Sequence, residues 1–180
     1  MADQEVPAQK WTDAEQGATG QERTARRVSV RAARAADIPG LVASSAGLFA
    51  EDAGTRDPGV DAAWPRAHGA ASFAAALENP SRLVLVAERA GQVVGHLTGS
   101  LTEPSAMRPV KSATLISMYV QPTHRGDGAG AQLVAAFFAW AAEQGARRTE
   151  VTAYTDNADA IRFYERHGFC PHSVTLSRPL

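Results

Sequence analysis

The sequence has little cysteine, no excess of either charge and no long apolar stretch. It contains one cysteine, Cys170, which excludes an internal disulfide and favours a reducing compartment. The formal net charge of −1 gives no reason to expect nucleic acid or an anionic membrane as a partner. No apolar run approaches the roughly 18 residues of a membrane span, and the first residues lack the hydrophobic stretch of a signal peptide. We therefore expect a cytoplasmic protein.

Metal chemistry is also not indicated, because no group of His, Cys or acidic residues has the spacing of metal ligands. The lone Cys170 follows Phe169 in an apolar setting, which predicts a small buried hydrophobic residue rather than a nucleophile. The length of 180 residues suits one domain with a tail. Residues 1–27 hold few large apolar side chains, so we predict a disordered tail there and a single domain over residues 28–180.

The most informative segment is a glycine-rich turn in the second half of the chain. An apolar run, 114–120, is followed by Gly126, Gly128 and Gly130 and then by a helical apolar pattern that lasts to Ala142. This order predicts a strand, a tight turn and a helix. Glycines adopt positive φ and let a ligand approach the backbone, and a helix N-terminus presents unpaired N–H groups. The turn therefore predicts a phosphate or pyrophosphate site.

Three other interpretations of the turn were weighed. A P-loop would require a lysine after the glycines, and none is present. The dinucleotide fingerprint fits Gly126-x-Gly128-x-x-Ala131, but its acid, Glu150, opens the next strand instead of following it, and too little chain remains to complete a Rossmann half. A purely structural glycine turn, which binds nothing, is the third.

Two motifs carry a resemblance to a known family. The pattern Arg125-x-x-Gly128-x-Gly130, after a strand and at the start of a helix, resembles the acyl-CoA pyrophosphate loop of the GNAT superfamily of N-acetyltransferases. The segment 157–169, with the pattern Asn-x-x-Ala-x-x-Phe-Tyr-x-x-x-Gly-Phe, is similar to the helix after that superfamily's fifth strand. Both occur in the family's order and at its spacing. The resemblance covers residues 28–180 and is weakest in the first quarter of that span.

Hydrophobic periodicity outlines the remaining elements. Helices are expected after Asp37 as N-cap, after Trp64, after the glycine turn with Gly145 as C-cap, and after Asp156 or Asn157 as cap. Strands are expected over residues 28–31, 83–88, 93–101, 114–120, 149–154 and 174–176. The predicted fold class is α+β, with a mixed, mostly antiparallel central sheet and flanking helices. The strands at 114–120 and 149–154 are parallel because a helix crosses between them, and the resemblance implies that this pair splays apart.

The resemblance also implies where acetyl-CoA, the cosubstrate, would bind. Its pantetheine arm would enter the slot between the splayed strands and pair with the backbone of one of them. Tyr164 would protonate the leaving thiolate, since a phenol with a pKa near 10 can donate to a thiol group with a pKa near 8.5; the alternative is a core tyrosine. The expected cofactor-binding residues are Met118, Tyr119, Val120, Arg125, Gly126, Asp127, Gly128, Ala129, Gly130, Ala131, Asn157 and Tyr164.

The acceptor site is less clearly marked. Residues 51–61 hold four acids against one arginine, which fits either a solvated loop or an acceptor site for a cationic amine. The resemblance places the acceptor site in this part of the chain, so Glu51 and Asp52 are the candidates. Trp64 is either a cation–π contact beside them or a core residue.

The general base is not evident. Many relatives carry a glutamate on the strand that here spans 114–120, where this chain has Thr114 and Ser117. Glu51, Asp52, His96 or an ordered water are the possible substitutes, whereas His124 and His167 are expected to shape the surface.

These observations predict an N-acetyltransferase that transfers the acetyl group of acetyl-CoA directly to a primary amine in a ternary complex. The acceptor would be a small molecule or peptide, and we also expect a homodimer. The alternative is a non-catalytic acyl-CoA-binding or sensing module on the same fold.

Overall fold

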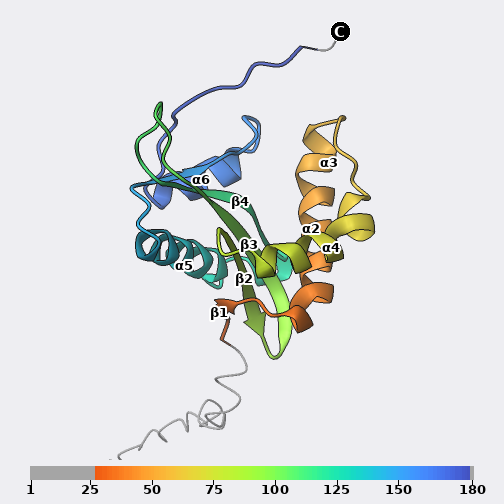
Figure 1. The fold of residues 1–180 in the computed structure, drawn as a ribbon. Coiled ribbons are helices and arrows are strands. Elements are labelled where there is room, and N and C mark those ends of the chain that lie inside the picture. The colour runs from red at the N-terminus through yellow and green to blue at the C-terminus, as the bar shows by residue number, and fades with distance from the viewer. Residues whose placement is uncertain (1–26, 179–180) are drawn as a thin grey trace, which may run out of the picture.

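A five-stranded sheet lies at the centre of the protein, whose computed structural model describes residues 27–178 (Figure 1). The predicted tail therefore lies outside the described residues, apart from Arg27. The strands follow one another across the sheet in chain order. They are β1 (Ser29–Ala32), β2 (Arg82–Arg89), β3 (Gln92–Thr102), β4 (Ser112–Val120) and β5 (Arg148–Val151).

Helices cover both faces of this sheet (Figure 1). On one face lie α2 (Ile38–Glu51), the short α3 (Ala53–Arg56) and α4 (Trp64–Glu78), and on the other lie α5 (Ala129–Glu143) and α6 (Ala158–Arg166). Two 3₁₀ turns, η1 (Ala35–Asp37) and η2 (Pro122–His124), precede α2 and the glycine turn. No helix within residues 27–178 has the length and hydropathy needed to cross a membrane.

The pairing of the strands confirms the predicted α+β class. The pairs β1–β2, β2–β3 and β3–β4 are antiparallel, and only β4 and β5, which α5 connects, are parallel. A helical crossover returns the chain to the same end of the sheet, which makes the two strands that it joins parallel.

The parallel pair separates halfway along β4. Its pairing with β5 runs from Ser112 opposite Arg148 to Leu115 opposite Val151, whereas β4 continues to Val120. On the other edge of β4, Leu115 pairs with Gly99 and Ser117 with Thr98, so Ile116 is an extra residue, a β-bulge. A bulge bends its strand and ends regular pairing. The result is a slot along residues 116–120, as the resemblance implied.

The two faces of the sheet differ in chemistry. The α5 face holds the larger apolar core, in which Leu97, Leu115, Leu133 and Phe137 are almost fully buried. The α2 face has a smaller apolar cluster around Leu41. Beside it lies a set of buried polar side chains, namely Ser44, Ser45, His96 and Thr98. Buried polar groups require hydrogen-bond partners, and those of Ser44, His96 and Thr98 are described below.

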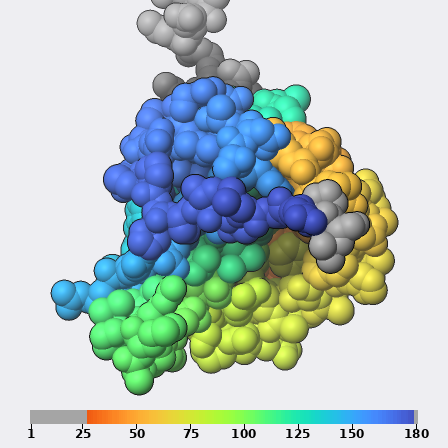
Figure 2. All heavy atoms as spheres, turned by 90° about the horizontal axis from the view of Figure 1, so that it is seen from above, coloured from red at the N-terminus to blue at the C-terminus, as the bar shows by residue number. Residues whose placement is uncertain are grey.

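The end of the chain differs from the prediction. Residues 174–176 form no strand, and Val174 and Leu176 are 72% and 90% exposed. Cys170 is exposed, so the expectation of a buried residue was wrong. Residues 173–178 extend away from the sheet instead of returning to it (Figures 1 and 2), which leaves Val174 and Leu176 without a core to join. The strand expected to reach Tyr154 also ends early, at Val151.

One predicted helix cap was also wrong. The side chain of Asp37 makes no capping hydrogen bond to α2. It accepts from the backbone N–H of Arg34 at 2.7 Å and forms a two-bond ion pair with Arg31. A paired guanidinium is a stronger partner than a helix N–H, so the carboxylate faces β1 instead of the helix. The ion pair with Arg31 lowers the pKa of Asp37.

Candidate active site

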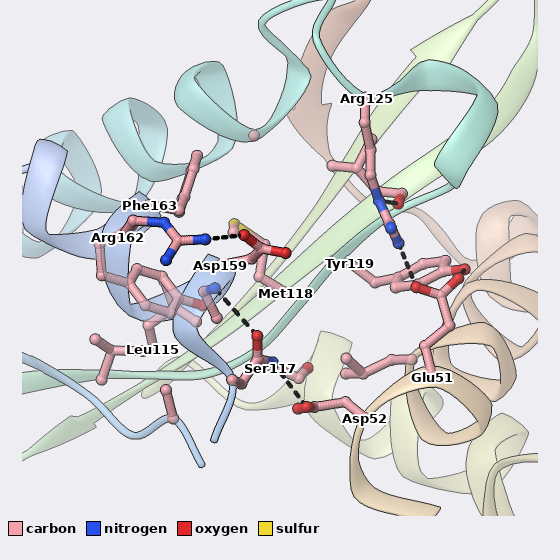
Figure 3. Close-up of a pocket in the computed structure, with 18 of the residues that line it drawn as sticks. Glu51, Asp52, Leu115, Ser117, Met118, Tyr119, Arg125, Asp159, Arg162 and Phe163 are labelled. Atoms are coloured by element: carbon pink, nitrogen blue, oxygen red, sulfur yellow. Dashed lines mark hydrogen bonds and ion pairs between the residues drawn. The ribbon is translucent and has the colours of Figure 1, made fainter. Parts of the chain in front are cut away.

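A pocket of about 730 Å³ opens where β4 separates from β5. Its walls come from the end of α2, the second half of β4, the glycine turn, the end of β5 and α6. We call the wall formed by residues 126–131 and α6 the glycine side, and the wall formed by the end of α2 and the side chains of Ser117 and Tyr119 the acidic side (Figure 3).

The turn on the glycine side has the geometry that its sequence predicted. Gly126 and Gly128 have φ of 87° and 79°, and Gly128 is the N-cap of α5. Side chains rarely adopt such φ values, because Cβ collides with the backbone. The first helical hydrogen bond runs from the N–H of Gln132 to the carbonyl of Gly128, so the N–H groups of residues 129–131 have no partner within the helix. These residues line the pocket.

Two residues of the turn have other contacts. A Cβ at Gly130 would lie 3.2 Å from the ring of Phe163, so this glycine lets α5 pack closely against α6. Asp127 does not line the pocket, because its carboxylate pairs with Arg89 at 3.0 Å. The turn is therefore held from outside by an ion pair and from behind by an aromatic ring.

Asn157 connects the two sides of the pocket. Its Oδ1 accepts from the N–H of Ala160 at 3.1 Å, which caps α6, as one of the two predicted caps would. Its Nδ2 donates to Oδ1 of Asp52 at 2.8 Å, across the pocket at the end of α2. Both groups of one amide are thus used to fix α6 relative to α2.

Tyr164 lies on α6 and lines the pocket. Its ring makes edge contacts with Phe163 and Phe169, with centroid distances of 5.5 and 5.7 Å. Burial, and then the charge of Asp52, raise the pKa of Tyr164 to about 12. Among the described residues its hydroxyl makes no hydrogen bond, so the phenol is held neutral with a proton free to donate.

Glu51 is the centre of the acidic side. Its Oε1 accepts from the Tyr119 hydroxyl at 2.6 Å, and its Oε2 pairs with Nη2 of Arg125 at 2.5 Å (Figure 3). Burial alone would raise the pKa of Glu51, but the bonds from Tyr119 and Arg125 outweigh it and lower the pKa. Burial and the bond to Glu51 raise the pKa of Tyr119 to about 12. Glu51 is therefore ionised near neutral pH.

Arg125 faces the acidic side instead of the glycine turn. Besides its ion pair with Glu51, its Nε donates to the carbonyl of Val120 at 2.9 Å, and its guanidinium lies 5.4 Å from the centre of the Tyr119 ring. The pocket is also lined by Arg56 and by two arginines on α6 that were not predicted, Arg162, which pairs with Asp159, and Arg166. Their only signal in the sequence is a spacing of four residues on one helix.

The other acids of the predicted segment have specific partners. Asp52 pairs with Arg56 at 3.0 Å, while Asp57 and Asp61 accept from the backbone N–H groups of Gly59 and Ala63. Part of the segment is helical, as α3. Trp64, a candidate for the acceptor site, does not line the pocket; it is 39% exposed and stacks on Phe49 with a centroid distance of 6.1 Å.

Comparison with known proteins identifies the architecture. The sequence pattern of the Acetyltransferase (GNAT) family matches residues 49–169, more than half of the chain. The chain belongs to this family. An uncharacterised N-acetyltransferase of Mycobacterium tuberculosis (strain H37Rv) is 34% identical over 99 residues, which are 55% of this chain and 60% of that protein. An uncharacterised N-acetyltransferase of Mycobacterium bovis matches to the same extent. The match thus spans less than two thirds of the length of these relatives.

Solved structures share the GNAT fold at lower identity. The aminoglycoside N-acetyltransferase AAC(6')-Iy, solved in complex with CoA, superposes with a TM-score of 0.68 at 19% identity, over 85% of this chain and 95% of that one. A variant of the BH1408 protein from Bacillus halodurans gives 0.72 at 20% identity, over 84% and 99%. These likenesses bear on the fold alone.

The residues that the sequence suggested as the general base are all either bonded to other side chains or buried. Glu51 and Asp52 have the partners described above. His96 is fully buried, and burial lowers its pKa to about 4. Its Nε2 lies 3.3 Å from Oγ of Ser117, which does line the pocket. His96 therefore reaches the pocket only through that hydroxyl.

Proposed function

We propose that this protein is an acetyl-CoA-dependent N-acetyltransferase that acts on a primary amine by direct transfer in a ternary complex. The observation that carries the proposal is the unpaired edge of β4 over residues 116–120, which ends beside the glycine-capped N-terminus of α5. The proposed activity needs these two features together, one for an extended arm and one for a pyrophosphate.

The residues on the glycine side fit the anionic part of acetyl-CoA. The N–H groups of residues 129–131 would bind the pyrophosphate at the positive end of the α5 dipole. The open edge of β4 over residues 118–120 would pair with the pantetheine arm as a strand would. Arg166 would add positive charge on the same wall, where the charge of Arg162 is paired with Asp159. Because Arg125 is held by Glu51, we propose that it separates the two sides of the pocket rather than binding phosphate.

The chemistry needs three contributions from the protein. It must place the neutral amine nitrogen against the thioester carbon, where a C–N bond forms and the C–S bond breaks. A backbone N–H within residues 118–120 would stabilise the negative charge on the carbonyl oxygen. Tyr164 would donate its proton to the leaving sulfur, while the proton from the nitrogen passes to water. The raised pKa of Tyr164 keeps the phenol protonated until the thiolate forms.

The acceptor would enter from the acidic side. Glu51 is ionised there, and Asp52 lies next to it, so a cationic molecule with a second, charged amine fits better than an anionic one. Several fold neighbours are aminoglycoside acetyltransferases, and aminoglycosides are polyamines of this kind. This likeness supports an amine of that class as a first substrate to try.

Two measurements test the proposal on the full chain. Calorimetry with acetyl-CoA should show binding, and release of free thiol with a panel of primary amines should show turnover for at least one cationic amine. Binding without turnover across the panel would favour the non-catalytic sensing module. Absence of binding would reject the assigned pocket altogether.

A further inference from the structure

A chain of buried polar side chains leads from α2 to the pocket. Oγ of Ser44 lies 2.7 Å from Nδ1 of His96, and Nε2 of His96 lies 3.3 Å from Oγ of Ser117. Ser117 is also bonded to Oγ1 of Thr98 at 2.7 Å. Ser44 and His96 are 1% and 0% exposed, so they reach the pocket only through Ser117, which lines it. The mechanism above uses none of these groups.

The position of Ser117 is determined by the β-bulge. The extra residue, Ile116, precedes it, and β4 no longer pairs with β5 from this point on. Ser117 pairs with Thr98 across β3 and β4, so the two hydroxyls lie on the α2 face of the sheet, with Tyr119 two residues further on the same face. Ser117 thus stands where the acidic side meets the open edge of β4.

The tautomer of His96 decides which atom Ser117 presents to the pocket. We assign the ring proton of His96 to Nδ1, which then donates it to the oxygen of Ser44 at 2.7 Å. Nε2 then carries no proton and accepts the hydroxyl proton of Ser117, while Thr98 donates to the same oxygen. The oxygen of Ser117 keeps one lone pair, and that lone pair is free to face the pocket.

We propose that Ser117 accepts a hydrogen bond from the acceptor amine, and that His96, held by Ser44, is the positioning residue that orients the Ser117 hydroxyl. The inference rests on the proposed function. An attacking primary amine needs an acceptor for one of its N–H groups so that its own lone pair points at the thioester carbon. Glu51 and Asp52 are already bonded to Tyr119, Arg125, Arg56 and Asn157. Ser117 holds the nitrogen but does not remove its proton.

The test uses the cationic amine that gives the highest turnover. Ser117→Ala should lower kcat about tenfold or more, while the dissociation constant of acetyl-CoA stays within twofold. Ser117→Thr, which keeps the hydroxyl, should restore most of the activity. His96→Leu should cause a loss similar to that of Ser117→Ala, and it should add little in the Ser117→Ala background, because His96 acts through that hydroxyl.

His96→Gln separates positioning from proton transfer, and it replaces His96→Leu if that variant does not fold. Its amide can bond to Ser117 but cannot take a proton, so kcat should stay within a fewfold of wild type. Three results would overturn the inference: kcat of Ser117→Ala within twofold of wild type, multiplicative losses in the double variant, or a loss in His96→Gln as large as that in Ser117→Ala. A wild-type protein without turnover would instead reject the proposed function.

Discussion

The two sides of the pocket are built from different parts of the polypeptide. The glycine side presents main-chain N–H groups, two glycines at positive φ and one phenol. The acidic side presents side chains that are nearly all bonded to one another, with Glu51 between Tyr119 and Arg125. Backbone geometry tolerates many substitutions but few at its glycines, whereas a side-chain network changes whenever one partner is removed. The two sides should therefore respond to mutation in different ways.

The strongest test of this comparison is a substitution of Tyr164, the one side chain on the glycine side with a proposed chemical role. Tyr164→Phe keeps the ring and its contacts with Phe163 and Phe169 but removes the proton. We expect kcat to fall by roughly 10²-fold, while acetyl-CoA binding hardly changes, as for the loss of a general acid. Single-turnover thiol release, with calorimetry alongside, measures both. Turnover within twofold of wild type would make Tyr164 a packing residue.

Substitution of a glycine should act on binding instead. Gly128→Asp places a negative charge at the N-terminus of α5, where the pyrophosphate is proposed to lie, so the affinity for acetyl-CoA should fall at least tenfold. The matched control is Gly145→Asp, because Gly145 has a φ of 75° and follows the other end of α5, outside the pocket. The control shares the backbone strain and should keep its affinity. Equal affinity of the two folded variants would reject the assigned loop.

The same difference explains how much could be predicted from the sequence. The glycine side is made of two segments that are each continuous in the chain. The strand, turn and helix of the first could therefore be recognised from local pattern, and the capping role of Asn157 from its place before α6. The bonds of the acidic side join residues far apart in sequence, such as Glu51 with Tyr119 and Arg125. A segment rich in acids gives no sign of those partners before the sheet brings α2 beside β4.

Some local patterns were also misleading, because tertiary contacts decided them. The alternation at residues 174–176 is typical of a strand, but a strand forms only where a neighbour can pair with it. Asp37 has the place of a helix cap, yet a two-bond pair with Arg31 is the stronger partner. The sequence named Ser117 and His96 separately but did not indicate the connection between them, since it depends on the register of β3 and β4.

A smaller effect should appear in the stability of the acidic side. The pKa of Glu51 is lowered in the folded protein, so its bonds stabilise the fold above the ordinary glutamate pKa of 4.5, and this stabilisation is lost as pH falls through the lowered value. Glu51→Gln should lower the free energy of unfolding at pH 7 by less than about 1 kcal/mol, because the pair is partly exposed. Urea unfolding at pH 7 and pH 3 should show the difference between variant and wild type shrinking at the lower pH. A difference that stays constant would mean that charge is not involved.

The smallest effect concerns the long-range field of the acidic side. Four acids with one arginine would attract a cationic amine strongly, but the structure pairs Glu51 with Arg125 and Asp52 with Arg56, so much of that field is cancelled locally. Salt screens charges over about 10 Å at 0.1 M, so it weakens the attraction of the remaining field for a cationic amine. We therefore expect the KM of the preferred cationic amine to rise only about two- to threefold between low and high salt. Asp52→Asn should reduce the rise, whereas Glu143→Gln, an exposed acid at the end of α5 that does not line the pocket, should leave it unchanged. A KM that does not depend on salt, with a neutral amine preferred, would show that these ion pairs only hold α2 in place.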